Sequence, residues 1–457
     1  MGQPVPESAG AQREGALTWG SMLRLFLPLS LSDVIMILSG PILTIGLTRL
    51  AHPQISLAAY SVALNVAILL ESPIIMLLHA STALSRYRET YRPLRLFMIW
   101  ANALLTALFL LIAFTPAYDW LFRGVLGQPA AIADAARPAF QLLLLSPAAI
   151  GWRRFHQGIL INHKRSNLVA YAGFARVGSL SLVTVLGVLG KGHGATVAGL
   201  ALVTSVIVEA AAVTWLTRPY LKEREAKEED QAPAWAPRTV WQIAGWYWPL
   251  AMTQILVWIV RPLINGGIAR TPDPELGLAA WPVAWTTIGM VANSVRMVQQ
   301  LALTLLKDRQ SYLMLRRFML AAGLGASGLM ALLAFSPLGL GYMEWVLGLR
   351  GGLQSVALAA VPALQIGLFY PLMVALQNWM QGLLVRNGRT GAVNAGAITG
   401  GTITMAVVYT GALVWQLPGA SLGVIAIMSG GLAELAVLYL ASRQEQRHWL
   451  AHQTPQR

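Results

Sequence analysis

The sequence consists largely of apolar runs, each about as long as a helix that crosses a lipid bilayer. Such a helix needs roughly 20 consecutive apolar residues, and polar segments with proline or glycine, such as "AHPQ" and "RTPDPE", separate the runs. Twelve runs can be marked, and they begin near Leu23, Ser56, Leu94, Pro138, Asn167, Ala195, Gln242, Leu276, Arg317, Val356, Gly391 and Ala420. This pattern predicts an all-α polytopic membrane protein with twelve transmembrane helices.

The composition narrows the class of protein further. Charged residues make up only 11% of the chain, whereas soluble domains contain about 25%. The net charge of +14 is spread over many loops rather than gathered on one soluble face, so we expect no nucleic-acid partner. The chain has no cysteine and no spaced histidine cluster, which predicts no metal and no bound cofactor. No small-residue cleavage site follows the first run, so we expect it to be retained as a span.

Lysine and arginine are distributed unevenly between the two sides of the predicted bundle. If both termini are cytoplasmic, 22 of the 33 basic residues fall in cytoplasmic segments, which agrees with the positive-inside rule. Those on the far side are Arg49, Arg123, Arg137, Lys191, Arg270 and Arg350. Those within predicted spans are Arg153, Arg154, Arg176, Arg261 and Arg296. We therefore expect a multi-pass protein of the inner (plasma) membrane with cytoplasmic termini.

One long polar interruption near the midpoint divides the chain into two halves. It begins at "RPYLKEREAKEEDQAPAWAPR", and we interpret residues 218–240 as a cytoplasmic linker. Residues 23–217 then form an N-terminal six-helix bundle and residues 241–442 a C-terminal one. Residues 1–22 and 443–457 are expected to be a cytoplasmic N-terminal segment and a cytoplasmic tail.

The two halves repeat each other at a nearly constant offset. Three positions recur 221 residues later, where Pro28, Pro41 and Arg49 match Pro249, Pro262 and Arg270. Further matches pair Gln157 with Gln381 at 224, and Gly194, Glu209 and Arg218 with Gly419, Glu434 and Arg443 at 225. Each repeat holds an even number of spans, so both begin on the same side of the membrane. Paired bundles of this kind are typical of transporters that enclose a site at the bundle interface.

Four segments carry a resemblance to a known family. "LFLPLSLSD", "QGILINHKRSNLV", "WYWPLAMTQILVWIVRPLIN" and "PGASLGV…GLAE" resemble the progressive ankylosis (ANKH) family, a branch of the MOP flippase superfamily that also holds the MATE exporters. The resemblance implies two pseudo-symmetric six-helix bundles and export of multivalent anions. Citrate, nucleotides and pyrophosphate are the substrates associated with the family. In the first span, the acid–amide pair of animal members is replaced by Gly40 and Pro41.

The repeat helps to sort the charges within the spans. An ionisable residue in the bilayer is costly and marks a functional site by default. A residue present in both halves more often serves the shared scaffold, and by this criterion Glu209 and Glu434 are structural. A residue present in one half breaks the symmetry and more often serves a substrate. The predicted substrate-binding residues are therefore Arg261, Arg296, Asn265, Asn293, Arg153, Arg154 and Arg176.

Arg261 stands directly before a proline within an apolar run. Pro262 lacks a backbone N–H and predicts a kink or a local break of the helix. Asn265, four residues on, lies on the same face and can add hydrogen bonds to an anion or to Arg261. Arg261 either contacts the substrate or forms an internal ion pair with Asp33 or Glu71.

The other embedded arginines also have two interpretations. Arg296 forms a polar stripe with Asn293. Lys307, which marks the cytoplasmic interface, lies about 16 Å further along a helix, so the Arg296 side chain would have to extend unusually far to reach that interface. We therefore favour a cavity role for it. Arg153, Arg154 and Arg176 either face the cavity or pack against lipid headgroups or a cytoplasmic loop.

Two acids occur in the N-terminal half only. Asp33 and Glu71 are either proton or cation sites that couple transport, or counter-ions that neutralise Arg261 and Arg296 in the empty cavity. Several tryptophans near the ends of runs, Trp281 among them, are typical of an interfacial aromatic belt. Both interpretations of the acids stay open at this point.

The sequence thus predicts a monomeric secondary-active exporter of multivalent anions, whose partners are a small anionic substrate, the bilayer and a coupling ion such as the proton. A MATE-like drug/cation antiporter and a lipid-linked precursor flippase are the alternatives. No paired-carboxylate, H-x-x-x-x-D or Ser/His/Asp arrangement stands out at a membrane boundary, so an enzyme is not expected.

Overall fold

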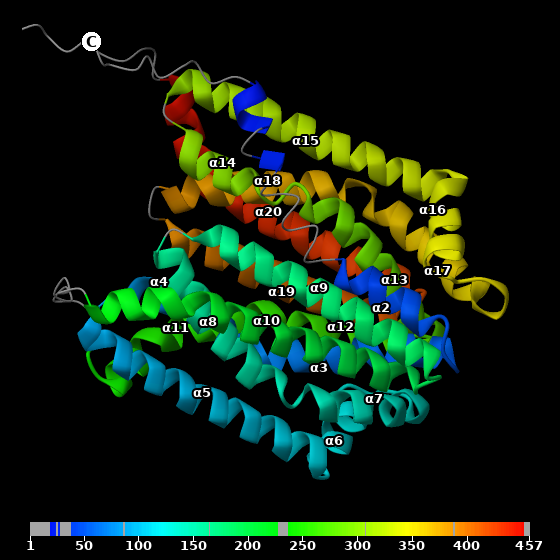
Figure 1. Ribbon diagram of the computed structural model, residues 1–457. Coiled ribbons are helices and arrows are strands. Elements are labelled where there is room, and N and C mark those ends of the chain that lie inside the picture. Colours follow the sequence, from blue (N-terminus) through cyan, green and yellow to red (C-terminus); the bar gives the residue numbers. More distant parts are fainter. Residues whose placement is uncertain are drawn as a thin grey trace, which may run out of the picture.

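The computed structural model describes residues 19–23, 26–27, 38–85, 87–163, 165–226, 236–306, 308–386 and 389–451, and all regular structure in these ranges is helical (Figure 1). Eight segments are long and apolar enough to cross a membrane. Six of them are formed by single helices, namely α5 (Arg88–Phe114), α9 (Ser166–Leu189), α10 (Gly194–Ala226), α15 (Arg309–Phe335), α19 (Thr390–Leu413) and α20 (Gly419–Ala451).

The remaining predicted spans are broken or only partly described. Span 2 consists of α3 (Pro53–Ile75) and α4 (Leu77–Leu84), and span 4 consists of α7 (Ala130–Leu143) and α8 (Ser146–Asn162). Spans 7 and 8 consist of α11 (Val240–Trp258) with α12 (Val260–Ile268), and α13 (Pro274–Asn293) with α14 (Val298–Leu305). Span 10 consists of α17 (Gln354–Ile366), η4 (Gly367–Phe369) and α18 (Tyr370–Arg386), and α2 (Ser39–Leu47) is the described part of span 1. The predicted twelve-span, all-α fold is confirmed.

The breaks recur at equivalent places in the two halves. Span 2 is interrupted at Met76, and its repeat mate, span 8, at residues 294–297. Span 4 is interrupted just before Ser146, and its repeat mate, span 10, just before Tyr370; each of these two residues is followed by a proline. Span 7 is interrupted at Ile259, because Pro262 has no N–H to donate to the carbonyl of Trp258. The break predicted from Pro262 is therefore confirmed, and the repeat extends to the irregular parts of the fold.

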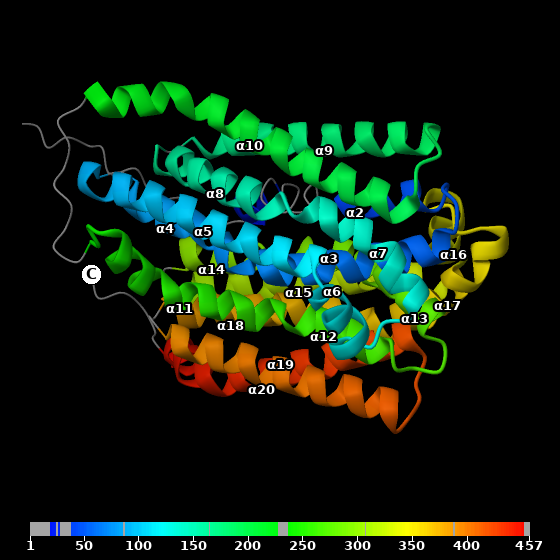
Figure 2. The ribbon, with the colours of Figure 1, turned by 90° about the horizontal axis from the view of Figure 1, so that it is seen from below.

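The long helices run side by side between two ends of the molecule (Figures 1 and 2). One end carries α6 (Ala117–Asp119), α16 (Pro337–Gly341), η3 (Gly351–Leu353) and the π-helices η1 (Trp120–Val125) and η2 (Tyr342–Val346), and it is called the π-helix end. The opposite end carries the last turns of α10 and the first turns of α11, and it is called the linker end. Of the six basic residues predicted for the far side, five lie at the π-helix end: Arg123 is in η1, Arg350 directly precedes η3, Arg137 pairs with Asp119 of α6, Arg270 bonds to Val125 of η1, and Arg49 lies beside Gly348.

The two halves share one core and exchange their first spans at the linker end. The largest apolar cluster joins α3 and α13 across the middle of the molecule. The α11 residues Ile243, Tyr247 and Ala251 pack in an apolar cluster of the N-terminal half, and the Tyr247 hydroxyl donates to the carbonyl of Pro73. Phe26 in turn packs against Phe318 of α15, with ring centroids 5.2 Å apart. The boundary between the bundles at residue 241 stays a prediction.

Candidate functional site

Three broken spans meet around Arg261. Arg261 lies in the first turn of α12, Arg296 in the turn between α13 and α14, and Tyr370 at the start of α18. Arg261 interacts electrostatically with both of the others. Irregular backbone within a membrane is tolerated only where it is buried in protein or lines a cavity, so these residues, called the break cluster, mark the candidate site.

An aromatic ring packs on the half-buried Arg261, and further rings pack beside Tyr370. Its guanidinium lies over the Trp258 ring, 4.4 Å from the centroid, which is cation–π geometry. Tyr370 packs edge-on against Trp285 at 5.3 Å, and Trp285 stacks on Trp281. Within the described ranges, no carboxylate forms an ion pair with Arg261 or Arg296. The break cluster therefore holds two cations and several aromatic faces.

The predicted polar stripe of span 8 does not lie on one continuous helix. The turn at residues 294–297 interrupts it, and Arg296 is exposed within that turn. The Arg296 guanidinium donates to Asn293 Oδ1 at 3.3 Å, and Asn293 Nδ2 donates to the Gly289 carbonyl at 2.7 Å. Asn293 thus orients Arg296.

Asn265 lies one turn beyond Arg261 toward the π-helix end. Its side chain is fully buried, and neither Oδ1 nor Nδ2 bonds to any group in the part of the chain that the structure describes. Its backbone carbonyl accepts from Gln128 Nε2 at 3.4 Å. A buried amide without partners is costly unless water or a ligand completes its hydrogen bonds, so Asn265 has free capacity to bind.

A second group of charges lies within the N-terminal half, and we call it the N-terminal charge cluster: Arg153, Arg154, Arg176, Glu71 and Glu209. Arg153 of α8 forms a buried ion pair with Glu209 of α10, and Arg176 of α9 lies 3.7 Å from the same carboxylate. Gln157 donates to Glu209 at 3.1 Å and accepts from Arg154 at 3.3 Å. Three of the predicted substrate ligands are thus held by an internal network.

The C-terminal half keeps the same framework without its arginines. Glu434 accepts from Gln381 at 3.0 Å and from Gln377 at 3.3 Å, and these glutamines are the repeat mates of Gln157 and Arg153. Gly400 replaces Arg176, and a Cβ there would lie 2.9 Å from the Gly430 carbonyl. Close helix packing therefore takes the place of the ion pair. The geometry agrees with a helix-bridging role for Glu209 and Glu434.

The two acids of the N-terminal half have different outcomes. Glu71 is buried, its Oε2 has no hydrogen-bond partner among the described groups, and its charged neighbours are Arg153, Arg176 and Arg154. It belongs to the N-terminal charge cluster rather than to the break cluster, so its pairing with Arg261 or Arg296 is not found in this structure. Asp33 lies outside the described residues, and its role stays a prediction.

Two contacts between the halves at the π-helix end have equivalent acceptors in the repeat. Arg270 donates to the carbonyls of Leu126 at 3.2 Å and Val125 at 3.1 Å. Across the pseudo-twofold axis, Thr48 Oγ1 donates to the Leu347 carbonyl at 2.5 Å. The acceptors belong to two copies of "VLG", residues 125–127 and 346–348, at the repeat offset of 221. We call these contacts the paired latches.

The glycine of each "VLG" is required by the backbone and by the close approach. Gly127 and Gly348 have φ of 65° and 81°, in the left-handed region that favours glycine. A Cβ at Gly127 would lie 3.2 Å from the Arg270 guanidinium, and one at Gly348 would lie 2.9 Å from Thr48 Oγ1. The sequence analysis missed this motif, although the repeat offset would have identified it.

Sequence and structure comparisons agree on the family and the fold. The sequence model of the family "Progressive ankylosis protein (ANKH)" matches residues 12–273, more than half of the chain. The chain belongs to the ANKH family. A comparison with curated protein sequences gives no match.

Among solved structures, an inward-facing multidrug resistance MATE family transporter of the MOP superfamily aligns with a TM-score of 0.71 at 16% identity, covering 92% of this chain and 96% of that one. An outward-facing structure of a multidrug resistance MATE family transporter aligns with a TM-score of 0.60 at 15% identity. The alignment covers 94% of this chain and 96% of that one. The lipid II flippase MurJ in an inward closed conformation aligns with a TM-score of 0.62 at 11% identity. The alignment covers 91% of this chain and 87% of that one. This ANKH-family chain thus has the MOP superfamily fold, and its helices are arranged more like the inward-facing MATE structure than the outward-facing one.

Sequence reasoning also missed or misassigned the aromatic residues of the site. Tyr370 was not singled out, although it precedes a proline at the position that matches Ser146. Trp281 was expected in an interfacial belt, but only 4% of it is exposed and it stacks on Trp285 in the interior. That expectation was wrong because the end of an apolar run in the sequence does not coincide with the surface.

Proposed function

We propose that this ANKH-family protein is a secondary-active exporter of multivalent anions that works by alternating access of its two halves. The observation that carries the proposal is the break cluster, in which Arg261 and Arg296 interact electrostatically and neither is ion-paired with a carboxylate of the described segments. Arginine binds carboxylate or phosphate through two parallel hydrogen bonds and stays charged in a dry site. Two neighbouring arginines therefore suit a substrate with more than one negative charge.

The shape of the site supports the same class of substrate. Asn265 offers an unsatisfied amide one turn from Arg261, and the Trp258 ring covers one face of the Arg261 guanidinium and would shield that face from water. Excluding water strengthens the attraction between a guanidinium and an anion. Citrate, pyrophosphate and nucleotides, the substrates associated with the family, all carry several negative charges. In this proposal Asp33 neutralises Arg261 when the site is empty.

We assign the linker end to the cytoplasm and the paired latches to the outer face of the inner membrane. The excess of lysine and arginine on the linker side supports this orientation. The greater similarity to an inward-facing MATE structure agrees with closed latches at the π-helix end. Opening of the latches would then release the anion outward.

This gate gives a prediction for Arg270. Arg270→Gln removes the charge that binds two carbonyls of the opposite half, and bonds to charged donors contribute about 1.5–3 kcal/mol each. Because about 1.4 kcal/mol corresponds to a factor of ten, we expect the open population to rise at least tenfold even if only one of the two bonds is lost without replacement. Because the chain has no cysteine, the readout is the rate at which a maleimide labels Asn265→Cys, which is buried below the latch.

The matched control is Arg123→Gln. Arg123 lies at the same end but pairs with Asp119 and Asp134 of its own half. It should leave the labelling rate unchanged. Equal rates for the Arg270 and Arg123 variants would show that the latch does not close the site.

The substrate class is tested by transport itself. Proteoliposomes that contain the purified protein are supplied in parallel with labelled citrate, ATP, pyrophosphate and a cationic dye, with and without a pH gradient. We expect at least one of the anions to be transported and the dye to be excluded. Movement of the dye alone would overturn the proposal and indicate a cation antiporter like the multidrug resistance MATE transporters.

A further inference from the structure

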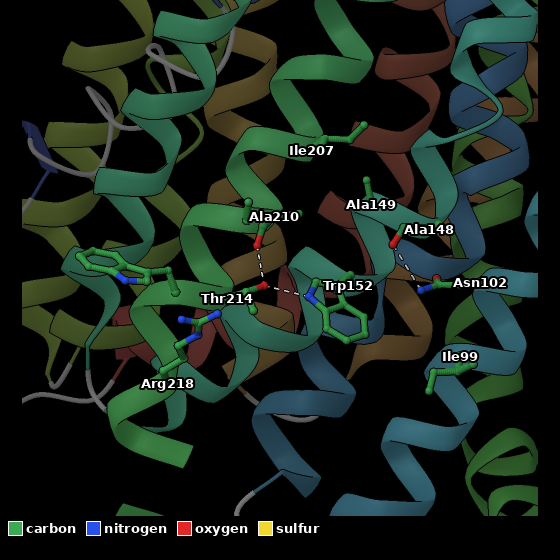
Figure 3. A pocket seen from close by; sticks show the side chains of 11 residues that line it. Ile99, Asn102, Ala148, Ala149, Trp152, Ile207, Ala210, Thr214 and Arg218 are labelled. Atoms are coloured by element: carbon green, nitrogen blue, oxygen red, sulfur yellow. Dashed lines mark hydrogen bonds between the residues drawn. The ribbon is translucent and has the colours of Figure 1, made fainter. Parts of the chain in front are cut away.

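The outer surface of the N-terminal half carries a groove that the transport site does not use. It has a volume of about 640 Å³ and runs between α5, α8 and α10 (Figure 3). Ile99 and Ile207 line it with exposed side chains, 44% and 43% accessible, and four alanines leave its floor open. In a membrane-spanning bundle such a surface meets lipid tails rather than water.

Most polar side-chain atoms on the floor of the groove are bonded within the protein. Asn102 Nδ2 donates to the Ala148 carbonyl at 3.3 Å, whereas Asn102 Oδ1 has no partner among the described residues. Trp152 Nε1 donates to Thr214 Oγ1 at 2.8 Å, and Thr214 Oγ1 donates to the Ala210 carbonyl at 2.6 Å (Figure 3). These bonds link α8 to α10 and use the polar atoms of both side chains. Apart from Asn102 Oδ1 and Arg218, the lining is therefore apolar or internally bonded and suited to a hydrocarbon chain.

The length of the groove matches one leaflet of a bilayer. Ile207 and Arg218 lie toward opposite ends of the part of α10 that lines it, eleven residues apart, which is about 16 Å at the rise of an α-helix. One leaflet of hydrocarbon is about half of the 30 Å core. An acyl chain that starts at Arg218 would therefore reach the middle of the membrane near Ile207.

Arg218 supplies a charge at the polar end of this groove. It is exposed near the end of the apolar part of α10, and no described carboxylate pairs with it. Trp215, exposed one turn earlier, suits the interfacial region. We propose that the groove binds an anionic phospholipid from the leaflet at the linker end, with its phosphate on Arg218 and one acyl chain along Ile99 and Ile207.

The position of the groove gives such a lipid a structural consequence. Trp152 and Ala210 on its floor are the direct chain neighbours of Arg153 and Glu209, which form the buried ion pair on the inner side of the same two helices. A lipid in the groove would contact both α8 and α10 at the level of this pair. This lipid site is separate from the proposed site for the transported anion, because it faces the bilayer and not the break cluster.

The test is lipid retention by the purified full chain, measured by native mass spectrometry after addition of phosphatidylglycerol or phosphatidylcholine with identical acyl chains. A basic residue near a membrane surface contributes about 1 kcal/mol to the binding of anionic lipid. The wild type should therefore retain phosphatidylglycerol about fivefold better than phosphatidylcholine. Arg218→Gln should abolish this preference.

Two further variants locate the site. Arg443→Gln changes the repeat mate of Arg218, an exposed arginine near the end of α20, and should leave the preference intact. Ala211→Trp fills the groove and should lower retention of both lipids. The proposal is overturned if the wild type shows no preference, if the two arginine variants lose it equally, or if Ala211→Trp retains both lipids as the wild type does.

Discussion

Arg261→Gln is expected to lower the initial rate of anion transport about a hundredfold while the protein remains folded in the membrane. Loss of one charged partner from a desolvated, hydrogen-bonded pair costs about 2–5 kcal/mol, and about 2.7 kcal/mol corresponds to a factor of one hundred. The protein should tolerate the change, because Arg261 is not ion-paired with any carboxylate whose position is described. The substitution therefore leaves no buried carboxylate of the described residues without its ion-pair partner.

The measurement is uptake into proteoliposomes of whichever anion the wild type transports. Arg261→Lys keeps the charge but loses the planar fork, and it should retain an intermediate rate. Arg123→Gln, an exposed arginine paired within its own half, is the matched control and should transport normally. A rate for Arg261→Gln as high as that of the control would rule out the break cluster as the anion site. Thermal unfolding of each variant separates loss of transport from loss of structure.

The sequence predicted those features of the fold that depend on local chemistry. The break in span 7 followed from Pro262, because a missing backbone donor acts within one helical turn. The repeat pointed to Glu209 and Glu434 as helix-bridging residues, and both accept bonds from a neighbouring helix. It did not show that Arg153 and Arg176, which occur in one half only, pair with Glu209. It also identified Arg261 as the charge that the second half adds to a shared bend.

The partners of these residues could not be predicted, because they depend on how helices face one another. Lipid tails are as apolar as the protein interior, so hydrophobicity does not tell which side of a transmembrane helix is buried. Trp281 was assigned to the surface for this reason. One of the two interpretations of Glu71 placed it near Arg261, but helix packing gives it Arg153 as a charged neighbour, 82 positions further along the chain. Tyr370 joins Arg261 across 109 positions through the same kind of long-range packing.

The comparison of Glu209 with Glu434 gives the largest expected effect on stability. In Glu209→Gln, the arginines Arg153 and Arg176 lose their buried carboxylate, and breaking a buried ion pair by removing one partner costs about 3–5 kcal/mol. Glu434→Gln removes only acceptors for two glutamine amides, at about 1 kcal/mol. The free energy of unfolding in detergent, from denaturant titration, should therefore fall several times more for the first variant.

A double variant distinguishes the loss of the ion pair from the loss of a hydrogen bond as the cause of the destabilisation. In Arg153→Gln/Glu209→Gln the guanidinium that had been left unpaired is itself removed, so the double variant should recover at least half of the stability lost in Glu209→Gln. A purely packing role for Glu209 would make the two losses add instead. Equal destabilisation by Glu209→Gln and Glu434→Gln would also contradict the assignment, because the two carboxylates occupy equivalent places in the repeat and differ in the arginines beside them. The N-terminal half would then not depend on this ion pair, and Arg153 and Arg176 would be free to bind an anion.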